Sequence, residues 1–515
     1  MRRRHGANSG GLATQAARSG ALVAAGRVLQ GVVSLASVAI LARILTPSDF
    51  GVFAMVLPLA LIVGMTLNRG LHVAVMHEAR LRPGQVSGLF WIASRFNVLL
   101  LTAMALSAPL LAMLYREPHV TVVALIWTAA LAFQALAAFP EALLKREMRF
   151  GVLTAIDTAG MVVGVGTAIS AAASGRTAVA LVLQVLTWNA VKCVGSTIAA
   201  RWVPSRPARH LDVDPVIQRL VSYGSDFGLA RAIYWLGRQV DRVVVGYVSG
   251  AAILGLYDGA RRWSWYPFQE LFLSLTDVVV ASLSRARHDA KRFRGYCRRG
   301  FTAFLALPLP AIVFVGMEAE LVVRVVLGER WLAAVPMVRI MCVAAVFDSV
   351  GRLTTWLYTA EGHTKQQLRW SVVSTVVTVV AVLAAADRGA TGVTLAFAAA
   401  TSALAIPGVA YCLRVSMLTA ADFARAVWRP VTASLLGAGM WVLVRDRLAT
   451  PDGMMTELVL DGFVFMTLYA TAWLALPGGR RATEEGVRLI RELSPYRPSR
   501  TSAASRTASA GHAPS

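Results

Sequence analysis

The sequence has few charged residues and few cysteines. Asp, Glu, Lys and Arg make up 15% of its 515 residues, whereas soluble globular proteins average about 25%. The four cysteines, Cys193, Cys297, Cys342 and Cys412, form neither a CxxC motif nor a Cys/His cluster. The pattern therefore indicates no disulfide framework and no metal site, and we expect four small buried side chains.

The sequence also lacks the short motifs of common enzymes. It contains no GxxxxGK[ST] phosphate-binding loop, no HExxH pair and no GxSxG turn. The connections between its apolar segments are short, so no large external loop is available to carry paired catalytic carboxylates. We therefore predict no catalytic residues, no metal and no cofactor, and we expect a protein that is not an enzyme.

Long apolar runs are what the sequence has in abundance. Hydrophobic residues make up 56% of the chain, and the mean hydropathy is +0.59. A helix needs about 20 apolar residues to cross the bilayer core. We expect spanning helices at 20–43, 50–73, 87–114, 119–142, 151–173, 177–200, 221–248, 253–281, 300–326, 332–360, 367–386, 390–413, 427–446 and 456–476. The predicted fold is an all-α polytopic membrane protein with about 14 transmembrane helices.

Basic residues predict how the chain is oriented. The formal net charge is +23, which in a membrane protein reflects the positive-inside rule and anionic lipids rather than nucleic acid. Basic residues are concentrated in every second loop: Lys145, Arg146 and Arg149 lie in one, whereas Arg176 stands alone in the next. Because basic loops resist translocation, we expect both termini to be cytoplasmic. The run from Arg285 to Arg299 is interpreted as a solvated loop facing lipid headgroups.

The longest connection divides the chain into two lobes. We expect a cytoplasmic N-terminal segment at 1–19, a first lobe of six helices at 20–200, a cytoplasmic loop at 201–220, a second lobe of six helices at 221–414, a final helix pair at 427–476 and a partly disordered cytoplasmic tail at 477–515.

Two segments indicate that the second lobe repeats the first. LARILTPSDFGVFAM covers Leu41–Met55, and VGYVSGAAILGLYDG covers Val245–Gly259. Each ends one helix, turns, and restarts with glycine, an apolar residue and an aromatic residue, so that Gly51 corresponds to Gly255, 204 positions later. Because six helices separate the copies, both lobes insert in the same orientation. This predicts a pseudo-two-fold axis along the membrane normal, as in transporters whose lobes rock against each other; two unrelated hairpins are the alternative.

Charged residues inside the predicted helices mark candidate binding positions. Arg231, Arg238 and Arg242 lie on one stripe of the helix predicted at 221–248. Charges at the bilayer centre cost roughly 2.5–3.5 kcal/mol each on insertion scales, so they persist where they face water, a partner or a ligand. We interpret the stripe as the wall of a cationic cavity for a large anion. The other candidate cations are Arg262, Arg352, Arg27, Arg69 and Arg95, and the candidate sites for a coupling ion are Asp157, Asp226, Asp241 and Asp348.

Structural explanations for some of these charges stay open. Asp258 with Arg262, and Asp348 with Arg352, are spaced to form ion pairs within one helix. In the first lobe, long side chains can extend to the cytoplasmic interface from four positions: Arg27, Arg69, Arg95 and Lys192.

Four motifs resemble one family. They are LARILTPSDFG at Leu41–Gly51, LKREMRF at Leu144–Phe150, DRVVVGYVSGAAILGLYDGARR at Asp241–Arg262 and LGERWLAAVPMVRIM at Leu327–Met341. Together they look like bacterial polysaccharide repeat-unit flippases, which export O-antigen and exopolysaccharide units. This family shares a superfamily with MATE multidrug transporters and lipid II flippases. The resemblance runs from about residue 15 to 415 and more loosely to 476.

The resemblance implies a fold, a substrate and a location. It implies two six-helix lobes in a V shape, a final helix pair, and a cationic cavity. The implied substrate is an oligosaccharide on polyprenyl pyrophosphate, moved from the inner to the outer leaflet of the bacterial plasma membrane by alternating access. The implied partners are this substrate, membrane lipids, H⁺ or Na⁺ as coupling ion, and other polysaccharide-assembly proteins. The motifs carry no residue-level site.

Three other functions stay open at this point. A multidrug–cation antiporter of the same fold would need an acidic or neutral cavity, which the arginine excess argues against. A membrane polymerase or ligase acting on the same lipid-linked sugars would need a substantial outer loop. A scaffold would not need charged stripes inside the membrane.

Overall fold

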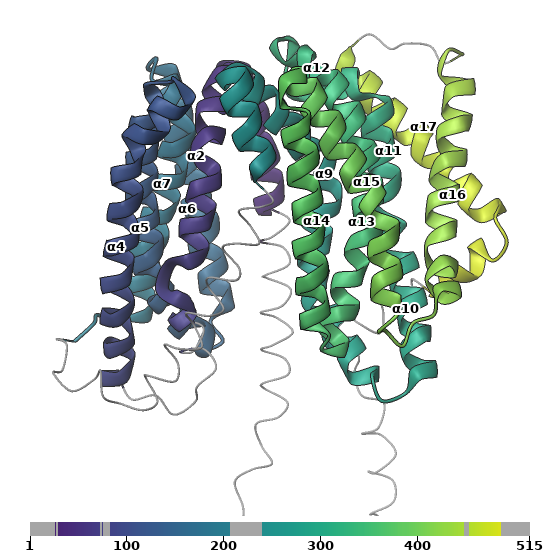
Figure 1. The fold of residues 1–515 in the computed structure, drawn as a ribbon, viewed down its shortest axis with the longest axis horizontal. Helices are drawn as coiled ribbons and strands as arrows, with labels where there is room; N and C mark the ends of the chain where they lie inside the picture. The colour runs from purple at the N-terminus through teal and green to yellow at the C-terminus, as the bar shows by residue number, and fades with distance from the viewer. Residues whose placement is uncertain are drawn as a thin grey trace, which may run out of the picture.

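The computed structural model describes residue 26, residues 29–72, residue 75 and residues 83–205, 239–447 and 453–485. Within these ranges every regular element is a helix. Figure 1 shows two upright helical bundles side by side, with a final helix pair at the outer flank of the second. This arrangement confirms the prediction of an all-α fold with two lobes and an appended pair.

The first lobe is built around long apolar helices. It contains the helix Leu29–Ile44. It continues with α2 (Pro47–Thr66), the short 3-10 helix η1 (Leu67–Gly70), α4 (Pro83–Tyr115), α5 (His119–Arg146), α6 (Phe150–Ala173) and α7 (Thr177–Ala200). A capping box begins α2: Thr46 accepts a hydrogen bond from the backbone N–H of Asp49, and Asp49 accepts from the Thr46 N–H. Helix 29–44 packs along α6 and α7, because the Gln30 and Ser37 side chains bond to residues of those helices.

The second lobe is also built entirely from helices within the described residues. Its elements are α9 (Val240–Ala286), α10 (Ala290–Leu305), α11 (Pro308–Met317), α12 (Ala319–Val326), η3 (Glu329–Ala334), α13 (Val335–Glu361), α14 (Thr364–Ala384), η4 (Ala386–Arg388) and α15 (Gly389–Leu413). The continuous span α9 is in fact a hairpin, since Gly250 breaks it with φ 76° and ψ −178°. Glycine adopts this conformation readily because it has no Cβ.

The final pair consists of α16 (Ala420–Arg445) and α17 (Met454–Ala475). It packs against α10, α11 and α12 of the second lobe. Buried Glu318 accepts a hydrogen bond from Trp441 Nε1 at 2.9 Å and pairs with Arg445 at 3.0 Å. Near the other end, Thr302 of α10 donates to the Ala426 carbonyl at 2.8 Å. The pair is therefore fixed to the second lobe at both ends.

Twelve helices of the described residues are long and apolar enough to cross a membrane. One of them, Val240–Tyr266, runs through the Gly250 turn. Most of the helix predicted at 221–248 lies outside the described residues, and Leu29–Ile44 is shorter than a full span. The chain is a multi-span membrane protein, and the count of fourteen stays a prediction.

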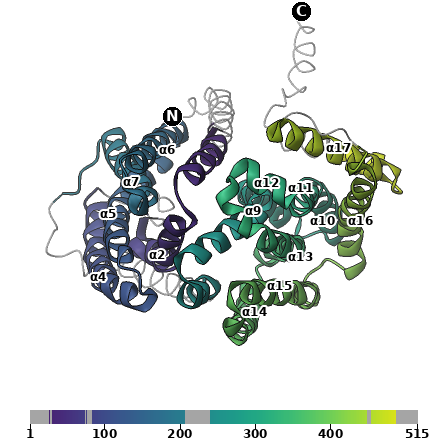
Figure 2. The ribbon, with the colours of Figure 1, turned by 90° about the horizontal axis from the view of Figure 1, so that it is seen from above.

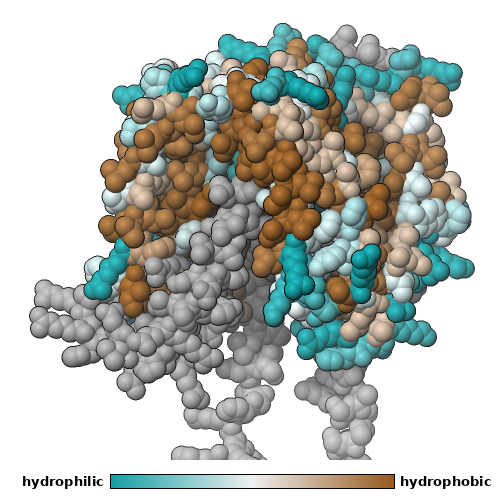
Figure 3. All heavy atoms as spheres, viewed as in Figure 1, coloured by the Kyte–Doolittle hydropathy of each residue, from teal (hydrophilic) through white to brown (hydrophobic). Residues whose placement is uncertain are grey.

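The surface of the described helices is divided into zones. In Figure 3 hydrophobic residues cover much of the middle of the visible face, while hydrophilic residues gather at its upper and lower ends. Leu99, Met113 and Phe463 are each more than two thirds exposed. Large exposed apolar areas of this kind are expected where lipid, rather than water, is the solvent.

Two details of the predicted second lobe were wrong. The segment interpreted as a loop from Arg285 to Arg299 is mostly helix α10, which begins at Ala290 after the N-cap Asp289. Its Phe293, Cys297 and Phe301 lie four residues apart and are all buried, so its charged residues occupy the opposite face. A search for continuous apolar runs misses such an amphipathic helix. In addition, the predicted span 300–326 is interrupted after Met317, where Glu318 separates α11 from α12.

The two lobes meet where α2 begins and the α9 hairpin turns. We call this the outer end, following the predicted orientation, and the opposite end the inner end. A Cβ atom on Gly51 would lie 1.7 Å from the Ala251 carbonyl oxygen, and a Cβ on Gly255 would lie 1.8 Å from the Pro47 carbonyl oxygen. Gly255 follows Gly51 by 204 positions, and Ala251 follows Pro47 by the same number, so the two contacts are equivalent under the predicted repeat. The pseudo-two-fold relation therefore holds at the joint itself.

Side chains reinforce this outer joint. Trp331 Nε1 donates to the Ala42 carbonyl at 3.0 Å, and its ring meets Phe50 edge-on with centroids 5.0 Å apart. Arg43 donates to the Val325 carbonyl at 2.9 Å. These contacts join the first lobe to α12 and η3 of the second, so the lobes are closed against each other at the outer end.

Candidate functional site

A cavity of about 670 Å³ opens between the lobes away from the outer joint. Helix 29–44, α5, α6 and α7 of the first lobe supply most of its lining, and Tyr266 and Leu271 of α9 supply the other side. Its charged lining residues are Glu141, Lys145, Asp157 and Lys192. Since both lobes line it, relative movement of the lobes would change its shape.

Asp157 is the centre of a hydrogen-bonded cluster in this cavity. Its Oδ1 atom accepts from Trp188 Nε1 at 3.0 Å and lies 3.3 Å from Lys192 Nζ. Its Oδ2 atom accepts from Gln30 Nε2 at 3.2 Å. Lys192 also pairs with Glu141 at 3.4 Å. One lysine therefore bridges two carboxylates from different helices.

The cluster is reachable from the cavity. The side chains of Lys192, Asp157 and Glu141 are 27%, 31% and 19% exposed, respectively. They lie five to eight residues from the inner ends of α5, α6 and α7, roughly 8–12 Å along the helix axes. Charges at this depth are expensive unless they pair with one another or are reached by water or a ligand. The arrangement can hold a small cation between the carboxylates or present the lysine to an anion.

Sequence reasoning found only part of this cluster. It selected Asp157 for ion coupling and noted Lys192, but it assigned Lys192 no partner. It missed Glu141, which falls next to the last residue of the predicted helix 119–142. The spacing of Glu141 and Lys145, which pair at 3.9 Å, was the available signal.

The α9 hairpin holds a second, more buried set of charges. Arg242 Nε donates to Asp258 Oδ1 at 2.7 Å, and Arg262 Nη2 lies 3.5 Å from Asp258 Oδ2. Arg261 pairs with Asp241, which also accepts from the Tyr257 hydroxyl at 2.6 Å. Asp241 and Asp258 are only 3% and 4% exposed. The Arg242–Asp258 and Arg261–Asp241 pairs join the two arms of the hairpin across the Gly250 turn.

The structure changes the interpretation of the predicted cationic stripe at Arg242, the one stripe residue that it describes. Arg242 and Arg262 share the single carboxylate of Asp258, in agreement with the structural explanation for the Asp258–Arg262 spacing. Asp241, a candidate for ion coupling, is occupied by Arg261. Arg231, Arg238 and Asp226 lie outside the described residues, so the rest of the stripe stays a prediction.

The remaining predicted residues fall in three places. Asp348 accepts from Arg352 Nε at 2.6 Å and from Trp265 Nε1 at 2.7 Å, which ties α13 to α9. Arg95 is exposed on α4. Arg27 lies outside the described residues, and of Arg69 only the backbone position in η1 is described. Within the described chain no group of three or more His, Cys, Asp or Glu residues is arranged to hold a metal ion.

Comparison with known proteins agrees with the architecture. Residues 40–336 match the family model described as "Polysaccharide biosynthesis protein". The lipopolysaccharide biosynthesis protein WzxC of Escherichia coli K12 is 22% identical over 366 residues, covering 70% of this chain and 74% of the relative. The teichuronic acid biosynthesis protein TuaB of Bacillus subtilis 168 is 21% identical over 312 residues, covering 59% and 63%.

Solved structures share the fold. The lipid II flippase MurJ in an inward closed conformation superimposes with a TM-score of 0.68 at 15% identity, covering 88% of this chain and 97% of that one. An inward-facing multidrug resistance MATE transporter of the MOP superfamily gives 0.57 at 15% identity, covering 75% and 94%. The family model spans more than half of the sequence, including the repeated turn at Gly51 and the α9 hairpin. The chain therefore belongs to the polysaccharide biosynthesis protein family.

Proposed function

We propose that this chain is a flippase. It moves oligosaccharide repeat units linked to polyprenyl pyrophosphate from the inner to the outer leaflet of the bacterial plasma membrane. The observation that carries the proposal is a charged cavity between two lobes that are closed at the outer end. Relatives named for lipopolysaccharide and teichuronic acid biosynthesis support the polysaccharide role, and the fold shared with a lipid II flippase supports transport. Both termini lie in the cytoplasm in this proposal, which a reporter fused to the C-terminus tests.

The cluster around Asp157 suggests how substrate and ion are coupled. Lys192 is held between two carboxylates, each within 3.4 Å. When a proton or Na⁺ neutralises Asp157, Lys192 loses one partner and becomes available to a phosphate group. The pyrophosphate enters from the inner leaflet, pairs with Lys192 and with arginines of the predicted stripe, and the lobes then rock to expose the sugar outside. The lipid tail stays in the bilayer throughout.

Reconstituted transport tests the proposal directly. A fluorescent polyprenyl-pyrophosphate oligosaccharide is placed in the inner leaflet of proteoliposomes, and its appearance in the outer leaflet is followed with an impermeant quencher. We expect the wild type to translocate it and the Lys192→Gln variant and the Arg231→Ala/Arg238→Ala variant to fail. Lys365→Gln, at an exposed position at the inner end of α14, is the control. Equal rates in all four proteins would refute the assignment.

The same experiment separates transport from catalysis. A flippase returns the oligosaccharide lipid chemically unchanged, whereas a polymerase or ligase lengthens or transfers the sugar. Mass spectrometry of the recovered lipid distinguishes these outcomes. We expect a single unchanged species.

A multidrug–cation antiporter is the second candidate. This chain shares its fold with a MATE transporter. Glu141 and Asp157 in the first lobe are carboxylates of the kind that binding of a cation would need. Lys192 between them disfavours an organic cation. Efflux of ethidium driven by a pH or Na⁺ gradient would establish this alternative, and we expect none.

A further inference from the structure

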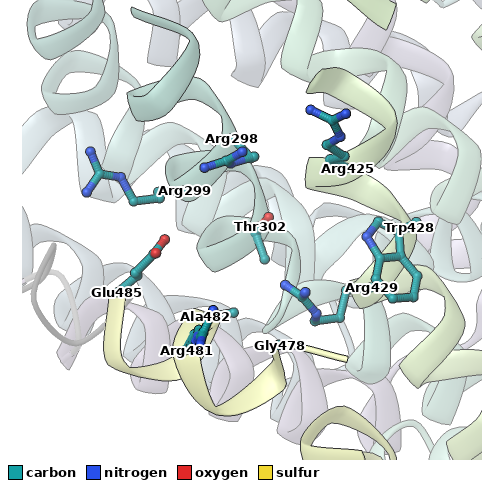
Figure 4. Close-up of a pocket in the computed structure, with 10 residues that line it drawn as sticks. All are labelled: Arg298, Arg299, Thr302, Arg425, Trp428, Arg429, Gly478, Arg481, Ala482 and Glu485. Carbon is teal, nitrogen blue, oxygen red and sulfur yellow. The ribbon is translucent and has the colours of Figure 1, made fainter. Parts of the chain in front are cut away.

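The inner end of the second lobe contains a pocket that the proposed transport cycle does not use. Its volume is about 240 Å³. Figure 4 shows its lining: Arg298, Arg299 and Thr302 come from α10, Arg425, Trp428 and Arg429 from α16, and Gly478, Arg481, Ala482 and Glu485 from the segment after α17. It shares no lining residue with the cavity between the lobes. We call it the arginine pocket.

The arginine pocket has a strong excess of positive charge. Five arginines and a single carboxylate, Glu485, line it. Arg425 is partly neutralised by Asp422 at 3.6 Å. Among the described residues, no carboxylate oxygen lies within ion-pair distance of Arg298, Arg429 or Arg481. Guanidinium groups repel one another when they are gathered in this way, so an anion is the natural counterpart.

Arg429 is held in place yet has an unused donor. Its Nη2 donates to the Pro477 carbonyl at 2.6 Å, and its guanidinium stacks over Trp428 at 5.2 Å. Its Nε is buried and has no hydrogen-bond partner. Buried N–H groups are almost always paired in native proteins. This N–H is therefore available to donate to an acceptor oxygen in the pocket.

A backbone turn at Gly478 brings the segment after α17 close to α10 and α16. Gly478 has φ +76°, and a Cβ there would lie 2.9 Å from Arg429 Nη2. Glycine adopts this positive φ readily because it has no Cβ. The turn after α17 thereby brings Arg481 to the arginines of α10 and α16.

We propose that the arginine pocket binds the phosphate of an anionic lipid of the inner leaflet. Arginine forms paired hydrogen bonds with phosphate oxygens through its planar guanidinium. The pocket lies near the inner ends of two membrane helices, where headgroups reside, and Trp428, 36% exposed, is the kind of side chain that sits at this interface. Clusters of basic residues at that level attract anionic lipids. The bound lipid joins the final helix pair to α10.

Lipid retention by the full-length protein tests this proposal without any transport measurement. The wild type, Arg298→Gln/Arg429→Gln/Arg481→Gln, and the control Arg285→Gln/Arg287→Gln/Lys291→Gln are purified in detergent. The control removes the same charge from exposed inner-end positions outside the pocket. Each protein is titrated with short-chain phosphatidylglycerol or phosphatidylcholine, and bound lipid is counted by native mass spectrometry. We expect the first lipid to bind at least tenfold more weakly to the pocket variant, with phosphatidylglycerol alone affected.

Two further measurements keep the test decisive. Ala482→Glu adds a carboxylate to the pocket without removing an arginine, and we expect it to weaken phosphatidylglycerol binding even if the triple variant folds poorly. Inorganic phosphate at millimolar concentration should not displace the lipid. The proposal is overturned if the pocket and control variants retain lipid equally, if phosphatidylcholine binds as well as phosphatidylglycerol, or if inorganic phosphate alone occupies the site.

Discussion

The Asp157 cluster and the α9 hairpin both place opposite charges inside membrane helices, but they differ in exposure. The hairpin acids Asp241 and Asp258 are almost completely buried, and each already has an arginine partner. Asp157 and Lys192 are about 30% exposed and face a cavity. A charge pair with no access to a cavity holds helices together, whereas a pair on a cavity wall can exchange its partner for a ligand. Exposure, more than charge, distinguishes the two sets, and we propose a transport role only for the exposed one.

Removing a hairpin acid should have the largest effect. Asp258→Ala leaves Arg242 buried without its partner, and breaking a buried pair costs about 3–5 kcal/mol. We expect a large loss of folded protein and a lower melting temperature in detergent. Replacing both partners, as Arg242→Met/Asp258→Leu, should recover part of that stability because no lone charge remains. A melting temperature unchanged by Asp258→Ala would show that the pair is not structural.

Blocking the outer joint should stop transport while leaving the fold intact. A Cβ at Gly51 meets the Ala251 carbonyl, so Gly51→Ala should prevent the lobes from closing and reduce transport at least 100-fold. Spin labels at Arg116 and Arg330, both exposed at the outer end, should move apart. Gly166→Ala is the matched control, since nothing lies within 4 Å of that position. Unchanged spin-label distances in Gly51→Ala would contradict the closed joint.

Neutralising the cavity carboxylate should affect coupling and spare stability. We expect Asp157→Asn to reduce gradient-driven transport about tenfold, equivalent to about 1.4 kcal/mol, with little change in melting temperature because the site is partly hydrated. The residual rate should no longer respond to a change in the pH or Na⁺ gradient. If the response to both gradients persisted, the coupling ion would have to bind elsewhere.

Breaking the pair of buried Glu318 and half-exposed Arg445 should give the smallest effect. Glu318 is buried, but Arg445 is half exposed, so water screens their interaction and exposed pairs contribute about 0–1 kcal/mol. We expect Glu318→Gln to lower stability by about 1 kcal/mol, because the amide retains the Trp441 hydrogen bond. Chemical denaturation should detect it, and the transport rate should not change. An effect as large as that of Asp258→Ala would remove the distinction between the two kinds of pair.

Much of the fold could be predicted from the sequence because membrane helices are determined mainly by local composition. The apolar runs located most spans, and the spacing of Gly51 and Gly255 indicated the repeat that the structure confirms. Helix α10 could not be found in this way, since its apolar residues occur only on one face. The Gly250 turn matched the predicted break between the helices at 221–248 and 253–281.

The candidate site was harder to predict because pairing depends on which helices are neighbours. Nothing local indicates that Lys192 of α7 lies between Glu141 of α5 and Asp157 of α6. Similarly, the stripe containing Arg242 suggests an unpaired cation until the hairpin brings Asp258 against it. Sequence patterns place a charge on a helix face, but only the packing of helices decides what faces it.

The outer joint has one more consequence. Gly51 and Gly255 each approach the main chain of the other lobe, so the central contact uses backbone atoms and carries no net charge. In the proposed orientation this contact faces the outside of the cell, and because it uses uncharged backbone atoms we expect closure there to be insensitive to ionic strength and acidity. The Asp157 cluster, for which we propose ion coupling, lies in the cavity away from this joint.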